Sequence, residues 1–134
     1  MVQLGISAFY HDSAAAIIVN GEVIAAAEEE RFTGIKHDFS FPINSINWIL
    51  KQNNISSKDI STVCYYENPK LKHDRDWKSY WKYFWKNPFK FPKRLNHLDD
   101  LEQIFPLSKI IYNNHHLSHL SYSCLLYTSD AADE

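Results

Sequence analysis

The Asn-Gly pair at residues 20 and 21 restricts the fold of this chain more than any other sequence feature. Aliphatic-rich runs flank the pair, at residues 14–19 and 22–27. Because a type I′ turn needs positive φ at both central residues, Asn-Gly between such runs is a strong signal for a β-hairpin. Residues 2–9 alternate apolar with small or polar side chains, as a half-buried strand does. We therefore predict a three-stranded antiparallel meander, with a polar corner at residues 10–13.

The next part of the chain predicts a helix and a fourth strand. Pro42 suits a first helical turn, and isoleucines and a leucine recur after it at helical spacing, which indicates a helix to about residue 53 with one face on the sheet. Residues 60–67 are rich in β-branched and aromatic side chains and predict a strand. A strand that follows a crossover helix is expected to pair in parallel with the meander.

Two further elements and a helix start complete the expected order. Residues 95–105 indicate a short helix, residues 108–112 a fifth strand, and residue 115 the start of another helix. The order is β-β-β-α-β, then an insertion, then β-α. This order matches an α/β fold of the ribonuclease-H-like kind, specifically a first lobe of that class.

Length and composition exclude several classes of protein. The 134 residues suffice for one domain, and the formal net charge of −2 argues against a protein that binds nucleic acid through overall basic charge. The three glycines, Gly5, Gly21 and Gly34, are too scattered for a P-loop or a dinucleotide-binding loop. The cysteines, Cys64 and Cys124, are too few for a disulfide framework. With no signal-peptide pattern and no apolar run long enough to span a bilayer, we expect a cytoplasmic protein without a membrane partner.

Residues 70–94 differ in character from the rest of the chain. They contain nine of the fourteen Lys and Arg residues, and eight aromatic residues lie between positions 77 and 91. Interleaved basic and aromatic side chains can bind nucleic acid or a membrane surface. They can equally form a local cap in which lysine stems lie over aromatic rings. The absence of any RNA-binding or helix-turn-helix motif favours the cap, and we expect no nucleic-acid partner.

A histidine cluster near residue 115 could bind a metal ion. If the chain is helical there, His115 and His119 are four residues apart and share a face, whereas His116 points elsewhere. Two imidazoles could then reach one ion, but a metal site needs further ligands, commonly carboxylates. The alternative is that these histidines bond to water or to the backbone.

His11 and Asp12 form a second candidate site, at the predicted corner after the first strand. A carboxylate at a strand end can face a ligand, but Asp in a turn often bonds to its own backbone, and from these residues alone the turn is the better interpretation. The acidic run at residues 28–31 is typical of a solvated charged surface, and composition gives no reason to select it as a site.

Several blocks of sequence resemble one family. The blocks are GISAFYHDSAAA at 5–16, AAEEERFT at 26–33 with KHD at 36–38 and FP at 41–42, YYENP at 65–69, and HHLSH at 115–119. Their order and spacing are similar to the start of the NodU/TobZ-type O-carbamoyltransferases. Because the blocks are collinear over about 120 residues, this resemblance is more specific than any single motif.

The resemblance implies an actin-like domain whose first lobe begins with the meander, followed in full-length members by a second lobe and a YrdC-like domain. The YrdC-like domain makes carbamoyl adenylate from carbamoyl phosphate and ATP. The actin-like domain then transfers the carbamoyl group to a hydroxyl of a small-molecule acceptor in secondary-metabolite or glycan biosynthesis. A divalent metal, iron in the best-known members, is implied at His115 and His119, and Asp12 falls beside the carbamoyl-adenylate pocket.

The general base of such a reaction is not assigned by the sequence; His11 and His37 are candidates. A relative that transfers threonylcarbamoyl to tRNA is the alternative enzyme, because that family shares the fold and the His-x-x-x-His pair. The blocks at 28–33 and 36–38 favour the small-molecule branch. A basic and aromatic binding module built on residues 70–94 is a third alternative.

The last residues depart from the family pattern. Residues 124–134 resemble an in-frame translation of a sequencing adaptor, so we interpret residues 1–123 as the N-terminal part of the transferase domain, with an insertion at 70–105. On this interpretation, the second lobe and the YrdC-like domain are partners outside this chain. We then expect the chain to be inactive alone.

Overall fold

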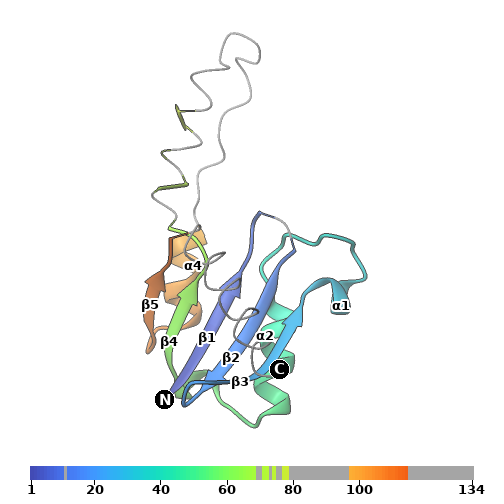
Figure 1. Ribbon diagram of the computed structural model, residues 1–134, viewed down its shortest axis with the longest axis vertical. Helices are drawn as coiled ribbons and strands as arrows, with labels where there is room; N and C mark the ends of the chain where they lie inside the picture. Colours follow the sequence, from blue (N-terminus) through green and yellow to red (C-terminus); the bar gives the residue numbers. More distant parts are fainter. Residues whose placement is uncertain (11, 69–70, 73, 75–76, 79–96, 115–134) are drawn as a thin grey trace, which may run out of the picture.

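A five-stranded sheet forms the centre of the protein (Figure 1). The computed structural model describes residues 1–10, 12–68, 71–72, 74, 77–78 and 97–114. The strands lie in the order β3-β2-β1-β4-β5. Their bounds are β1 Val2–Ser7, β2 Ala14–Val19, β3 Glu22–Glu28, β4 Ile60–Tyr65 and β5 Lys109–Tyr112. The chain is therefore of mixed α/β class, as the sequence predicted.

The pairing of the strands follows from the connections between them. Asn20 and Gly21 have φ values of 54° and 94°, and they join β2 and β3 as an antiparallel hairpin. β1 pairs antiparallel with β2 and parallel with β4, and β4 pairs parallel with β5. The carboxyl ends of β1, β4 and β5 consequently lie at the same edge of the sheet.

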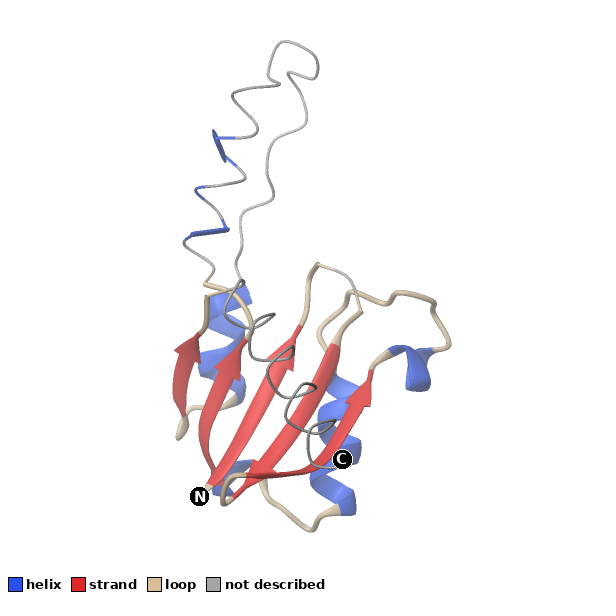
Figure 2. Ribbon diagram, in the orientation of Figure 1, coloured by secondary structure: helices blue, strands red, loops and turns tan. Residues whose placement is uncertain are grey.

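The main helices cover one face of this sheet (Figure 2). The helices are α1 Glu30–Thr33, α2 Ile43–Gln52, the 3₁₀ turn η1 Ser57–Asp59 and α4 His97–Ile104. α2 begins directly after Pro42, as predicted, and α4 falls inside the range predicted for a short helix. No helix in the described part of the chain is long and apolar enough to cross a membrane.

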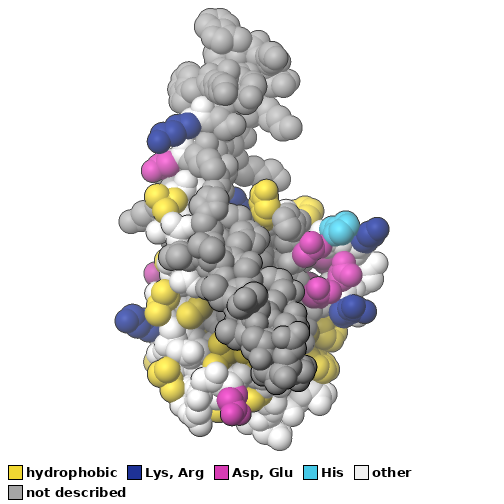
Figure 3. Space-filling model, viewed as in Figure 1, with side chains coloured by type: hydrophobic (Ala, Val, Ile, Leu, Met, Phe, Trp, Pro, Cys, Tyr) yellow, Lys and Arg dark blue, Asp and Glu magenta, His cyan; other side chains and the backbone are white. Residues whose placement is uncertain are grey.

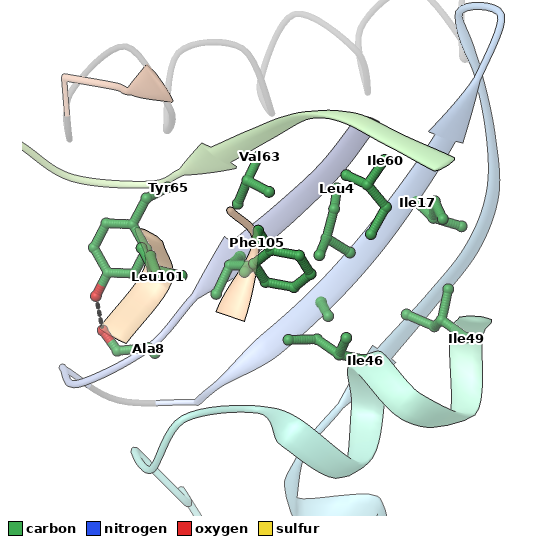
Figure 4. Close-up of a cluster of buried hydrophobic side chains, with 12 residues drawn as sticks. Leu4, Ala8, Ile17, Ile46, Ile49, Ile60, Val63, Tyr65, Leu101 and Phe105 are labelled. Atoms are coloured by element: carbon green, nitrogen blue, oxygen red, sulfur yellow. Dashed lines mark hydrogen bonds between the residues drawn. The ribbon is translucent and has the colours of Figure 1, made fainter. Parts of the chain in front are cut away.

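The core lies between the sheet and the two longer helices (Figure 4). Leu4 of β1 and Val63 of β4 are fully buried, Ile49 reaches them from α2, and Leu101 and Phe105 join them from α4 and the residue that follows it. Each such side chain stabilises the fold by roughly 1.5–3 kcal/mol relative to exposure. Leu101 and Phe105 are thus part of the core, whereas the residues between them are exposed.

Tyr65 connects this core to the edge of the sheet where the parallel strands end. Its hydroxyl donates a hydrogen bond of 2.8 Å to the carbonyl of Ala8, just beyond β1. Burial raises the pKa of the Tyr65 phenol above its ordinary value, so the hydroxyl stays protonated and keeps this bond. The segment after β1 is therefore tied to β4 from inside the core.

Candidate functional site

A connection between β1 and β2 carries the first candidate residue. We call residues 8–13 the site loop; the structure describes all of them except His11. Phe9 and Asp12 both have positive φ, 66° and 43°. Few side chains adopt this backbone region without outside support, so contacts made by the site loop must hold it.

A segment before α2 supplies part of that support. The amide of Phe9 donates to the carbonyl of Phe39 at 2.8 Å, and the amide of Ser13 donates to the carbonyl of Asp38 at 2.7 Å. The Ser13 hydroxyl donates to the carbonyl of Ser40. Residues 38–40 therefore run along the site loop and bring residue 37 next to it.

Asp12 and His37 meet as a hydrogen-bonded pair. The imidazole Nδ1 of His37 lies 2.8 Å from a carboxylate oxygen of Asp12, although the two residues are 25 positions apart. The hydrogen bond and charge of Asp12 raise the pKa of His37, because both favour the imidazolium. The side chains remain 63% and 47% exposed, so the pair is open to a substrate.

Glu30 completes the polar group around His37. Its carboxylate accepts a 3.0 Å hydrogen bond from the His37 amide, and its charge raises the pKa of His37 further. Ligand atoms of Asp12, Glu30 and His37 lie within 4.8 Å of one another. Acidic side chains gather beside a histidine on the side of the molecule that carries α1 (Figure 3). Since Asp12 already engages Nδ1, the arrangement suits proton transfer at the other ring nitrogen, Nε2.

The Asp38 carboxylate holds the segment in shape. It accepts hydrogen bonds of 2.8 Å from the Thr33 hydroxyl and from the Ser40 amide. The hydrogen bonds from Ser40, and then the one from Thr33, lower the pKa of Asp38. Asp38, the neighbour of His37 in sequence, therefore has a structural role: its carboxylate is engaged by Thr33 and Ser40.

Glu29 corrects the expectation of a solvated acidic run at residues 28–31. Its side chain is 1% exposed and accepts four hydrogen bonds at the start of α2. The donors are the backbone amides and the side chains of Asn44 and Ser45. A carboxylate is well placed there because the first helical amides lack partners within the helix and carry partial positive charge. Residues 30–33 also form the short helix α1.

A pocket is lined by residues of β1, β2, β3 and β4 and by parts of α1 and α2. Small side chains form its floor, among them Gly5, Ala16 and Cys64, and Phe32 and Trp48 form part of its wall. These two aromatic rings contact each other, with centroids 6.0 Å apart. Asp12 and His37 do not line this pocket, so it is separate from the polar pair.

Comparison with known proteins gives the family of the chain. The family described as "Carbamoyltransferase N-terminus" matches residues 2–90, which include Asp12, Glu30 and His37. The chain belongs to this carbamoyltransferase family. The resemblance drawn from the sequence blocks is thereby confirmed.

The chain matches only part of the length of each of three curated relatives. An uncharacterised protein of Synechocystis sp., sll1178, is 48% identical over 58% of this chain and 12% of its own length. Nodulation protein NolNO of Sinorhizobium fredii is 43% identical over 43% of this chain and 8% of its length. An uncharacterised 19.2 kDa protein of Rhizobium etli is 42% identical over 45% of this chain and 35% of its length.

One solved structure shares a partial likeness with this carbamoyltransferase family member. YeaZ from Pseudomonas aeruginosa aligns with a TM-score of 0.38 and 8% identity, over 51% of this chain and 29% of YeaZ. The curated relatives and this structure are all covered over much less than two thirds of their length.

Some of the candidate residues predicted from the sequence lie in the described part of the chain, and others do not. Asp12 and His37 come together, and Glu30, which sequence reasoning passed over, joins them. Its position within the block at 26–33 was the signal that could have selected it. His11, His115 and His119 lie outside the described residues, as do most of residues 70–94 and all of 124–134. Their proposed roles stay predictions.

Proposed function

We propose that this chain forms the first lobe of an actin-like, ribonuclease-H-like O-carbamoyltransferase domain. The family match supports carbamoyl transfer as the class of reaction. The order β3-β2-β1-β4-β5, with an antiparallel half and a parallel half, supports the proposed lobe. The hydrogen bond between Asp12 and His37 is the observation that carries the proposed chemistry.

In the proposed reaction, the hydroxyl oxygen of a small-molecule acceptor attacks the carbamoyl carbon of carbamoyl adenylate. A bond forms between that oxygen and the carbamoyl carbon. The bond between the carbamoyl carbon and the phosphate oxygen breaks, and AMP leaves with the electron pair. Carbamoyl phosphate and ATP are the co-substrates that supply the adenylate, through a YrdC-like domain outside this chain.

His37 is the proposed general base for this attack. Asp12 accepts the Nδ1 proton and so fixes the tautomer in which Nε2 can take the acceptor proton. General-base catalysis of this kind contributes typically ~10²- to 10⁴-fold. His11, the neighbour of Asp12 in sequence, stays a second candidate for this role.

A divalent metal, with iron as the first candidate, is proposed at His115 and His119. The carboxyl end of β5 lies at the same edge of the sheet as that of β1. The Asn113 amide donates a 2.9 Å hydrogen bond to the backbone carbonyl of Tyr65. The chain thus leaves the sheet towards residue 115 at the edge where the site loop begins. Imidazole ligands suit iron, and such an ion supplies Lewis-acid stabilisation of charge on the carbamoyl oxygen.

The proposed base is tested in the full-length protein that contains this chain. Pyrophosphate release reports adenylate formation, and carbamoylated acceptor reports transfer. His37→Gln should leave pyrophosphate release intact and lower transfer by about 10²-fold or more. Glu22→Gln, at the exposed first residue of β3, is the control and should transfer normally. Wild-type transfer by His37→Gln would overturn the assignment, and modification of tRNA alone would overturn the acceptor class.

The metal site is tested by metal content as well as by activity. His115→Ala and His119→Ala should each lower the iron bound per protein, measured by elemental analysis of the purified full-length protein. Each should also lower acceptor carbamoylation. Unchanged iron in both variants would remove the metal from the proposal and leave the role of His37 intact.

A further inference from the structure

A lysine beyond β4 makes three contacts near the site loop. The Lys72 ammonium donates a 3.2 Å hydrogen bond to the carbonyl of Phe9 and lies 3.9 Å from a carboxylate oxygen of Glu67. It also lies 5.8 Å from the centre of the Tyr10 ring, within range of a cation–π interaction. Two of these three partners belong to the site loop.

The low exposure of Lys72 and Glu67 restricts the movement of both side chains. The side chains of Lys72 and Glu67 are only 12% and 4% exposed. Removing a charge from water is unfavourable unless other groups compensate it, so an ammonium at this depth has little freedom to leave its partners. An exposed lysine could contact the same carbonyl without constraining it.

The contacts place the site loop between two supports. On one side, the Phe9 and Ser13 amides donate to Phe39 and Asp38. On the other side, Lys72 binds the Phe9 carbonyl. Phe9 is thus held through both its amide and its carbonyl at a positive φ that few side chains adopt unsupported.

We propose that Lys72 is a positioning residue: its ammonium, on a largely buried side chain and paired with Glu67, fixes the site loop so that Asp12 meets His37. The catalytic meaning of this role rests on the proposed function, but the positioning itself rests on the contacts of Lys72. It also gives the basic segment at residues 70–94 a first link to the site, through its third residue.

The state of the Asp12–His37 pair can be measured without any transfer activity. Among the residues that the structure describes, the charged groups that act on His37 are Asp12 of the site loop and Glu30 of α1, and both raise its pKa. A loosened site loop would withdraw Asp12 and lower the pKa of His37. Loss of the Lys72 charge acting only through space would raise it, because one repulsive cation is removed. The two effects therefore have opposite signs.

The test is an NMR titration of the His37 ring in the full chain, with the signal assigned by its loss in His37→Gln. In Lys72→Met, the pKa of His37 should fall towards the ordinary value of 6.5. Lys72→Arg, which keeps the charge, should restore the wild-type value. Lys78→Met, at an exposed lysine of the same segment, should leave it unchanged.

An unchanged or raised pKa of His37 in folded Lys72→Met would overturn the proposal. If Lys72→Met fails to fold, the double variant Lys72→Met/Glu67→Gln also removes the charge of the buried carboxylate, and the same criterion applies to it. Failure of both to fold would assign Lys72 to the stability of the whole lobe and would also overturn the proposal. None of these readings depends on carbamoyl transfer.

Discussion

The pKa of His37 is set mainly by Asp12, a residue on a different segment of the chain. The hydrogen bond from Nδ1 stabilises the imidazolium and raises the pKa of His37. A histidine acts as a base only when neutral, so the proposed transfer should be slow below this pKa and fast above it. The same shift contributes folding stability below pH 6.5, and this contribution is lost as pH rises through the folded pKa.

Asp12→Asn should move the pH dependence of transfer. The neutral amide no longer favours the imidazolium, so the pKa of His37 falls and the rising limb of the pH–rate profile moves to lower pH. The plateau rate should fall by roughly 10²-fold or more, because the tautomer is no longer fixed. The profile is measured as carbamoylated acceptor formed by the full-length protein. A limb at the wild-type pH would show that Asp12 does not act through His37.

Asp38→Asn should weaken the segment that presents His37. The bonds to Ser40 and Thr33 lower the pKa of Asp38, so its stabilising contribution is present above its ordinary pKa of 3.8 and is lost as pH falls through the folded pKa. The variant should therefore be less stable than wild type at pH 7, with a smaller difference at pH 3. Urea unfolding at both pH values measures this. Equal differences at the two pH values would contradict it.

At the scale of elements, the start of α2 is completed by a residue outside the helix. Neither Pro42 at the N-cap nor the first helical turn offers a side-chain cap or an acidic residue. Glu29, the residue after β3, supplies both, and its own amide donates to the Ser13 carbonyl at 2.8 Å. Glu29 thus joins α2 through its carboxylate and the end of the site loop through its amide.

Glu29→Ala should destabilise the fold by about 3 kcal/mol, because two amides at the start of α2 lose a charged acceptor inside the protein. Glu29→Gln should be milder, since its amide oxygen still accepts a hydrogen bond. Urea unfolding of the two variants gives the free energies. Glu22→Ala, at an exposed carboxylate of β3, is the control and should change stability little. A loss below about 1 kcal/mol in Glu29→Ala would contradict the capping role.

At the scale of the whole molecule, β3 stands at one edge of the sheet. Val23 and Ile24 on this strand are 65% and 42% exposed. An edge strand with exposed apolar side chains can pair with another chain through its outer backbone groups. We therefore expect β3 to be a site of self-association.

Val23→Lys should lower self-association of the chain without lowering its melting temperature, because a charged edge disfavours strand pairing and the position is already exposed. Light scattering as a function of concentration measures the association. Ile35→Lys is the matched control, since Ile35 is 60% exposed but lies in a loop. Equal effects of the two variants would mean that general surface polarity, and not the edge, controls association.

Local sequence determined most of the elements of this protein. Asn20 and Gly21 can adopt the positive φ of a tight turn, so the hairpin was predictable from the pair itself. The periodic isoleucines after Pro42 likewise predicted α2 and its buried face, because helical spacing is a property of neighbouring residues. The first strand was predicted two residues too long, since the left-handed turn at Phe9 depends on contacts with distant residues.

The tertiary structure alone decided how the site is built. Glu28, Glu29 and Glu30 are identical in sequence terms, yet only Glu29 is buried, because the fold brings the start of α2 to that position and to no other. The pairing of Asp12 with His37 and of Lys72 with Phe9 joins residues 25 and 63 positions apart. Such contacts depend on how the folded sheet arranges its loops in space, and a local pattern of residues does not determine that arrangement.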